Sequence, residues 1–220
     1  MGRRAGSGEI GRIELGYVGS AIYAGVLQAQ INRFRTAWPE VDIRSRELPM
    51  IDLPTLLAEG QVDIGFVRMP MMLPAGLSRY ITARDEFCVA FPADHPEAAV
   101  CGPVHPARLA GETFVLPEQD AGTYEVARRG RFNPQIVSSP GGIITVLAQV
   151  SLGSGISVVP SVAATTIRIP NIAFRSLAGD PIRSEVAAIY HAREASLAVK
   201  NFIRQIVQSP AKQIRLTVPA

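Results

Sequence analysis

The first 67 residues alternate strand and helix patterns with short connections, and this alternation constrains the fold more than any other feature. Apolar side chains recur at every second residue in the strands and at helical spacing in the helices. The predicted elements are a strand at 12–18, a helix from Ser20 to about Ala37, a strand at Val41–Leu48, a helix at about Leu53–Glu59 and a strand at Val62–Val67. Because parallel strands need crossover connections, this order predicts a parallel sheet with covering helices.

A second α/β unit is predicted from about Glu86 onward. Its elements are strands at Thr113–Leu116, Gln135–Ser138, Ile156–Val159 and near Ile172–Leu177, and helices around Tyr124–Arg129 and from after Gly142 to about Leu152. A long strand at 78–92, interrupted by three charged residues at 84–86, leaves the first unit. The last strand, Glu185–His191, and the last helix, about Ser196–Gln208, are predicted to return to it.

We therefore predict an α/β fold of two Rossmann-like subdomains joined by two crossover strands, with crossings near residues 83–87 and 178–184. The predicted boundaries are a linker remnant at 1–9, subdomain I at 10–85 plus 184–220, and subdomain II at 86–183. Double crossovers form a hinge, and the cleft between two such units is the default position for a ligand.

Composition excludes several classes of protein. The chain has 220 residues, of which 47% are hydrophobic and 19% charged, a balance that excludes disorder. Its two cysteines, Cys88 and Cys101, exclude a secreted disulfide framework and favour a reducing cytoplasm. The N-terminus is too polar for a signal peptide, and turn residues interrupt the longest apolar stretch, 143–162. We predict a soluble cytoplasmic protein without a membrane partner.

The net charge of +3 is concentrated at the N-terminus, where three arginines and Glu9 give residues 1–12 a charge of +2. Residues 13–220 therefore carry only +1, too little for the basic face that nucleic acid requires. Arg128, Arg129 and Arg131 form the one internal basic cluster of the sequence. A solvated helix end explains this cluster, and a phosphate site is the alternative. We predict that this chain does not contact DNA by itself.

No group of residues has the spacing of a catalytic or metal site, so we predict a protein that is not an enzyme and that needs no metal or cofactor. The three histidines lie in loops or at a strand end: His95, His105 and His191. Cys88 lies among apolar residues, which is typical of a core cysteine. Asp63 and the pair Asp85–Glu86 stand apart from other catalytic residue types, and this favours solvated or helix-capping roles.

Five motifs, in this order and at these distances, resemble the effector-binding domain of LysR-type transcriptional regulators. They are Gly11–Ser20, Phe34–Val41, Leu56–Gly65, Phe91–Pro96 and Gly153–Pro160. The resemblance covers nearly the whole chain. It implies a type II periplasmic-binding-protein-like fold that senses a small molecule, commonly a carboxylate, in the interdomain cleft.

The resemblance also implies partners. Family members usually carry a winged helix-turn-helix domain ahead of this region, so DNA would be bound only through an N-terminal domain that this chain lacks. RNA polymerase would be a further partner. Members are typically homodimers or homotetramers, whose geometry the effector would alter to control transcription. The alternative is a solute-binding protein of a transporter, which shares the fold class.

Candidate effector-binding residues follow the strands of the first unit. Ser20 is the predicted N-cap of its helix, where backbone N–H groups of Ser20 and Ala21 favour an anion. A helix cap without a role in ligand binding is the alternative explanation for Ser20. The resemblance, in contrast, places the effector carboxylate at this corner. Pro49 and Met50 follow the second strand. Similar regulators often place a small hydroxyl residue at the Met50 position, and the thioether here favours a flexible apolar wall.

Further candidates come from both units. Val67 and Arg68 end the third strand at the carboxyl edge, where ligands of open α/β sheets tend to lie. The Arg68 guanidinium suits a carboxylate, and an exposed arginine at a strand end is the alternative. In the second unit, Pro117–Glu118 follows a strand, and the resemblance places it at the cleft. Gly141–Gly142 opens a helix and permits close backbone approach, although a loop that needs positive φ explains both glycines equally well.

Overall fold

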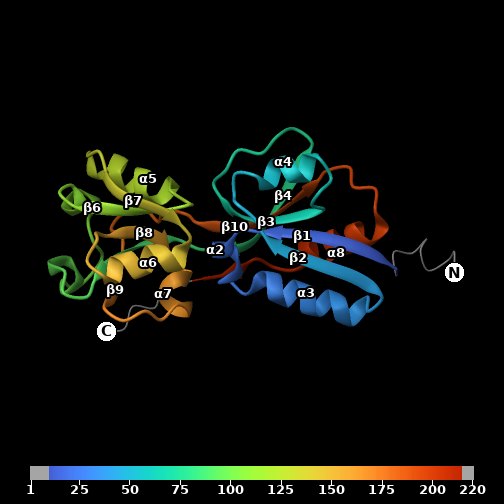
Figure 1. Ribbon diagram of the computed structural model, residues 1–220, viewed down its shortest axis with the longest axis horizontal. Helices are drawn as coiled ribbons and strands as arrows, with labels where there is room; N and C mark the ends of the chain where they lie inside the picture. Colours follow the sequence, from blue (N-terminus) through green and yellow to red (C-terminus); the bar gives the residue numbers. More distant parts are fainter. Residues whose placement is uncertain (1–9, 215–220) are drawn as a thin grey trace. The chain divides into compact units, whose positions relative to one another are not determined.

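The chain divides into two compact units (Figure 1). The computed structural model describes residues 10–214. The first unit takes the chain up to Arg84 and again from Glu185 to Gln213, and the second contains Asp85–Ser184. The chain therefore passes between the units at two junctions, 84/85 and 184/185. The predicted linker remnant at 1–9 and the last six residues of predicted subdomain I lie outside the described residues.

Unit 1 is built on a six-stranded sheet in the order β11-β4-β10-β3-β1-β2. Its strands are β1 (Gly11–Tyr17), β2 (Val41–Glu47), β3 (Ile64–Met69), β4 (Leu77–Arg84), β10 (Glu185–His191) and β11 (Lys212–Gln213). Its helices are α2 (Gly19–Ile22), α3 (Val26–Ala37), α4 (Leu53–Ala58) and α8 (Leu197–Gln208). As predicted, β1 pairs in parallel with both β2 and β3, and the returning strand β10 and helix α8 rejoin this unit.

The predicted single helix from Ser20 to Ala37 is wrong, because the chain forms two helices with a break at residues 23–25. Gly25 adopts a left-handed conformation, with φ of 73°, and its N–H donates to the carbonyl of Ile22 at 3.0 Å. This closes α2 after a single turn and starts α3 at Val26. The left-handed region is accessible to glycine at no steric cost, so the break falls there.

Unit 2 combines a three-stranded antiparallel sheet, in the order β8-β5-β9, with a parallel pair of strands, β6 and β7. Its strands are β5 (Phe87–Pro92), β6 (Thr113–Pro117), β7 (Gln135–Gly141), β8 (Ser157–Pro160) and β9 (Ile172–Ser176). Its helices are η1 (Pro96–Ala98), η2 (Pro106–Leu109), α5 (Ala121–Gly130), α6 (Ile143–Ser151) and α7 (Val162–Thr166). A parallel bridge between Phe114 and Ile156 joins the two sheets.

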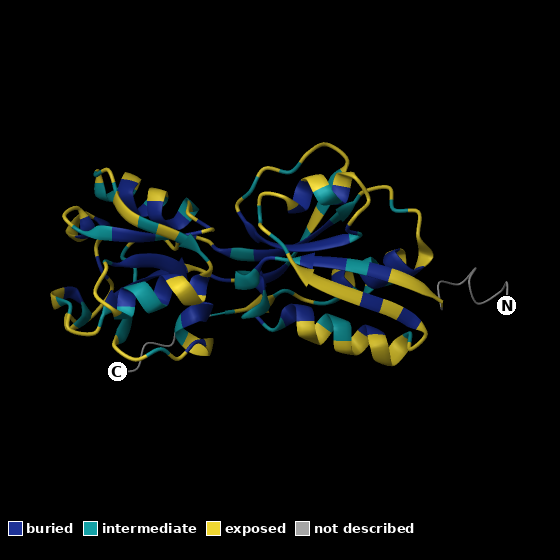
Figure 2. Cartoon of the chain, viewed as in Figure 1, coloured by how far each residue is buried: buried dark blue, intermediate teal, exposed yellow. Residues whose placement is uncertain are grey.

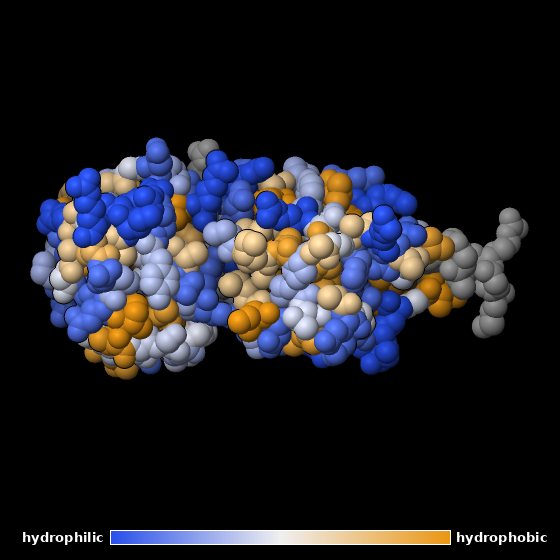
Figure 3. All heavy atoms as spheres, turned by 90° about the horizontal axis from the view of Figure 1, so that it is seen from above, coloured by the Kyte–Doolittle hydropathy of each residue, from blue (hydrophilic) through white to orange (hydrophobic). Residues whose placement is uncertain are grey.

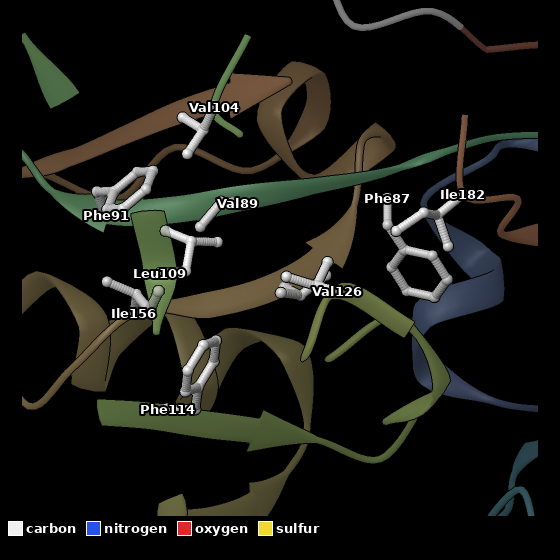
Figure 4. Packing of buried hydrophobic residues seen from close by; sticks show 10 residues of the cluster. Phe87, Val89, Phe91, Val104, Leu109, Phe114, Val126, Ile156 and Ile182 are labelled. Atoms are coloured by element: carbon white, nitrogen blue, oxygen red, sulfur yellow. The ribbon is translucent and has the colours of Figure 1, made fainter. Parts of the chain in front are cut away.

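Each unit buries its own apolar core (Figure 2). In unit 1, the rings of Phe34 from α3 and Phe202 from α8 meet edge to face at 4.8 Å, and both are fully buried. In unit 2, a cluster of valine, isoleucine, leucine and phenylalanine side chains fills the space between the sheets and helices (Figure 4). Both units therefore have the buried apolar surface that an independently stable core requires.

The surface is mixed in character, with hydrophobic residues in separate patches among hydrophilic ones on the face drawn in Figure 3. Within residues 10–214, no helix has the length and apolar character that crossing a bilayer requires. The longest helices, α3 and α8, have 12 residues each.

Gly155 provides a direct test of this packing. Its φ is 148°, and a Cβ there would lie 2.6 Å from the carbonyl oxygen of Thr113, which already accepts the N–H of Ile156. Gly155→Ala should therefore lower the free energy of unfolding by about 2 kcal/mol or more, measured by urea denaturation. Gly153→Ala is the matched control, because it is also strained, with φ of 79°, but opens onto free space. Equal losses for both variants would contradict the close contact.

Candidate functional site

The candidate residues of unit 1 gather at one edge of its sheet. Strands β2, β1 and β3 are adjacent and parallel, so the segments that follow them lie at the same edge. The six candidates there are Ser20 and Ala21 after β1, Pro49 and Met50 after β2, and Val67 and Arg68 at the end of β3. Backbone hydrogen bonds hold these segments together, from Val18 to Phe66 and from Leu48 to Tyr17, each at 3.0 Å.

Arg68 is the buried cation of this edge. Its side chain is fully buried, so the alternative of an exposed arginine at a strand end is wrong. Its Nη2 donates to the carbonyl oxygen of Ser20 at 2.8 Å. The guanidinium therefore ties the end of β3 to the first turn after β1, and a buried charge of this kind must be held by hydrogen bonds.

Ser20 does not cap its helix. The N-cap position of α2 is Val18, without a side-chain hydrogen bond, and Ser20 lies inside the single turn. The N–H of Ala21 donates to the carbonyl of Val18 at 2.9 Å, so this group is already paired within the turn. The predicted capping role is wrong because the N-cap is Val18, two residues earlier than predicted. The half-buried Ser20 hydroxyl remains a candidate ligand contact.

Glu47 adds a carboxylate that the sequence pattern does not reveal. A Cβ on Gly19 would lie 2.5 Å from its Oε1, so the carboxylate packs directly on the backbone at the start of α2. Burial raises the pKa of the neighbouring Tyr23 hydroxyl, and the charge of Glu47 raises it further. In the sheet register Tyr17 lies opposite Glu47, and this pairing brings Glu47 beside the turn that follows β1.

The four candidates of unit 2 also meet at one place. In the parallel pair of β6 and β7, Pro117 lies opposite Gly141, and the N–H of Glu118 donates to the Gly141 carbonyl at 2.9 Å. Gly142 follows as the N-cap of α6. Gly141 has φ of 80°, and a Cβ there would meet no atom within 4 Å. The positive φ therefore explains why residue 141 is a glycine, and a close approach of other atoms does not.

Two buried polar pairs lie beside the junctions of unit 2. Gln119 is 4% exposed, and its Oε1 accepts the hydroxyl of Ser184 at 3.1 Å. Asp85 is 2% exposed and accepts the hydroxyl of Ser161 and the N–H of Val162, the first residue of α7. The backbone N–H of Ser184 donates to the carbonyl of Asp85 at 2.8 Å. Asp85 therefore has the helix-capping role and not the solvated one, and it joins the two crossing segments.

The remaining reactive side chains have structural roles. His95 and His105 each accept a backbone N–H at Nδ1, and Nε2 of His191 lies 2.7 Å from a backbone carbonyl. Burial raises the pKa of the Cys88 thiol strongly, and the charge of Asp85 adds to the effect. Within the described part of the chain, no three histidine, cysteine or acidic side chains cluster as a metal site would need.

Glu125 of the same helix pairs with two arginines of the α5 cluster, and Arg129 also donates to the backbone carbonyl of Asp180. The carboxylate of Glu125 accepts hydrogen bonds from Arg128 and Arg129 at 2.8 Å, and these bonds lower its pKa to about 2. Arg131 follows as the left-handed C-cap of the helix. This arrangement is what a solvated helix end looks like, since exposed ion pairs at i,i+3 and i,i+4 are common on helices.

The architecture is the type II periplasmic-binding-protein-like fold, with two α/β units and two chain crossings. Residues 6–211 match the family described as "LysR substrate binding domain". The chain belongs to this family, as the five motifs predict.

Individual relatives agree with this assignment. The HTH-type transcriptional regulator XapR of Escherichia coli is 29% identical over 208 residues, which cover 92% of this chain and 69% of XapR. The crystal structure of CbnR, a LysR family transcriptional regulator, is 20% identical with a TM-score of 0.75, covering 93% of this chain and 72% of that one. A structure titled "BenM effector binding domain with its effector benzoate" is 23% identical with a TM-score of 0.73, covering 93% and 98%.

The chain is therefore the effector-binding domain of a LysR-type transcriptional regulator. The prediction that it is not an enzyme is confirmed, because the relatives are transcriptional regulators and not catalysts. The same relatives favour a regulator over the transporter alternative.

The two cysteines allow a test of this description. Cys101 is exposed and Cys88 is buried with a raised pKa, so a maleimide should label the native chain once, at Cys101. The denatured chain should take two labels, one on each thiol. Mass spectrometry after brief exposure at neutral pH measures both states. Rapid native labelling of Cys88 would contradict the packing of β5.

Proposed function

We propose that this domain binds a small carboxylate effector between the carboxyl edge of unit 1 and the β6–β7 end of unit 2. The observation that carries the proposal is the convergence of three parallel strand ends in unit 1, with the fully buried Arg68 behind the Ser20 turn. Ligands of α/β sheets lie at such carboxyl edges. The candidate contacts are Ser20, Ala21, Pro49, Met50, Val67 and Arg68 from unit 1, and Pro117, Glu118, Gly141 and Gly142 from unit 2.

The carboxylate class is supported by charge and by a relative. The Arg68 guanidinium has the donor geometry that pairs with a carboxylate, and its burial and its bond to the Ser20 carbonyl hold it at this edge. The related BenM domain has benzoate as its effector. Met50 offers a thioether where similar regulators often carry a small hydroxyl residue, so we infer an effector with an apolar body as well as a carboxylate.

Regulation would follow from differential affinity. An effector that binds one arrangement of the two units more tightly than another shifts the population toward the first. In a homodimer or homotetramer, that shift would respace the DNA-binding domains that relatives of this chain carry, and would alter contacts with RNA polymerase. We place this activity in the cytoplasm, where a regulator of transcription meets DNA.

Thermal melting against a panel of benzoate-like, muconate-like and aliphatic dicarboxylates tests the proposal. A ligand at 100 times its dissociation constant adds about 2.7 kcal/mol of stability. For a domain of this size, the expected rise in melting temperature is roughly 5–10 °C. Ser20→Trp should abolish the rise by filling the space beside α2.

Ser45→Trp is the matched control, since Ser45 is exposed in the middle of β2. It should leave the rise in melting temperature unchanged. A rise that survives Ser20→Trp in full, or no rise with any carboxylate of the panel, would contradict the proposed site and effector class.

A further inference from the structure

Glu47 is an unpaired carboxylate at the edge of unit 1 where the candidate effector contacts gather. It is exposed and is the last residue of β2, an edge strand that ends beside α2 (Figure 1). Its Oε1 lies against the backbone of Gly19, where a Cβ would come within 2.5 Å of it. Within residues 10–214, no cation forms an ion pair with this carboxylate and no group donates a hydrogen bond to it.

The arginines of the same strand bind other groups. The Nε of Arg44 pairs with the carboxylate of Asp42 at 3.0 Å. The Nη2 of Arg46 donates to the carbonyl of Gln61 at 3.1 Å. The negative charge of Glu47 is therefore not neutralised from within β2.

The phenol of Tyr23 does not neutralise the charge either. Tyr23 follows α2 directly and is half-buried. Burial raises the pKa of its hydroxyl, and the charge of Glu47 raises it further, so the phenol stays neutral. A neutral phenol can donate a hydrogen bond to a ligand but carries no positive charge. The one negative charge on this side of the turn is that of Glu47.

Opposite charges consequently flank two consecutive residues of one turn. Glu47 lies against Gly19, and the guanidinium of Arg68 donates to the carbonyl of Ser20 at 2.8 Å. Consecutive Cα atoms are about 3.8 Å apart. An effector that lies on this turn can meet both charges only if its own cationic and anionic groups are close together, as they are in an α-amino acid.

Binding of an effector here would remove water from the Glu47 carboxylate. A carboxylate that loses its water and gains no partner weakens binding. A second carboxylate on the effector would add repulsion between like charges. An ammonium group, in contrast, gives a charge-assisted hydrogen bond. This corner therefore disfavours dicarboxylates and favours an effector with an amino group beside its carboxylate.

We propose that Glu47 is a specificity-determining residue that selects an α-amino acid with an apolar side chain as the effector. The ammonium group of the effector binds the Glu47 carboxylate, its carboxylate lies toward Ser20 and Arg68, and its side chain packs on Met50. This assignment rests on the proposed function, because it concerns the same edge of unit 1. It names the class of effector among the small carboxylates.

Calorimetric titration with matched pairs of ligands tests the requirement for an amino group. The pairs are phenylalanine with 3-phenylpropanoate and leucine with 4-methylpentanoate, whose members differ only in that group. We expect at least one amino acid to bind saturably, at least about tenfold tighter than its partner, because the partner lacks one charge-assisted hydrogen bond. Equal affinity within each pair that binds, or no saturable binding of either amino acid at millimolar concentrations, would overturn the proposal.

A variant assigns the preference to Glu47. Glu47→Gln keeps the shape of the side chain and removes its charge, so the amino acid should bind no more than about threefold tighter than its partner. The affinity of the partner should not fall. Asp42→Asn is the matched control, because Asp42 is an exposed acidic residue near the other end of β2. It should keep the preference of the wild type, and a preference that survives Glu47→Gln in full would refute the role of Glu47.

The same titrations separate this assignment from the proposed function. Ser20→Trp should abolish binding of both members of each pair. If the acids without an amino group bind as tightly as the amino acids, and Ser20→Trp abolishes both, the role of Glu47 is refuted and the carboxylate site stands. If no carboxylate binds, with or without an amino group, or if Ser20→Trp changes nothing, the proposed function fails as well.

Discussion

The parallel pairing of β1 with both of its neighbours is the constraint on which the candidate site depends. Tyr17 lies opposite Glu47 of β2 and Phe66 of β3, so the three segments that follow these strands emerge together. The Arg68 guanidinium then joins two of these segments through the Ser20 carbonyl. A shift of one residue in either pairing would turn every side chain of the shifted strand to the other face and disperse the site.

The two chain crossings meet inside unit 2, where buried polar groups hold them. Asp85, the first residue after one junction, accepts the N–H of Ser184, the last residue before the other. The hydroxyl of Ser184 also donates a hydrogen bond to the side-chain oxygen of Gln119, the residue after the candidate Glu118. Buried polar groups are costly unless their bonds are made. This network therefore links the conformation of the crossing segments to that of one half of the candidate effector site.

Much of this architecture was predictable from sequence, because alternating apolar positions and turn residues are local signals. The elements of both units and the grouping of the candidate residues at strand ends follow from them. The start of α3 does not follow from these signals, since the helical spacing of apolar residues continues through Gly25. Only the backbone conformation of Gly25 shows the break. The contacts of Glu47 and Asp85 could not be predicted from the sequence either, because their partners lie at distant positions. Asp85 and its partner Ser161 are 76 residues apart.

In the proposed mechanism, an effector binds between the two units and biases their arrangement. Spin labels at Asn32→Cys in unit 1 and Leu152→Cys in unit 2, both exposed and outside the candidate contacts, with Cys101→Ser to remove the exposed thiol, report the distance between the units by pulsed electron resonance. A saturating carboxylate effector should shift or narrow the distance distribution, and Ser20→Trp should prevent this change. An unchanged distribution at saturation, with binding confirmed on the same sample, would contradict it.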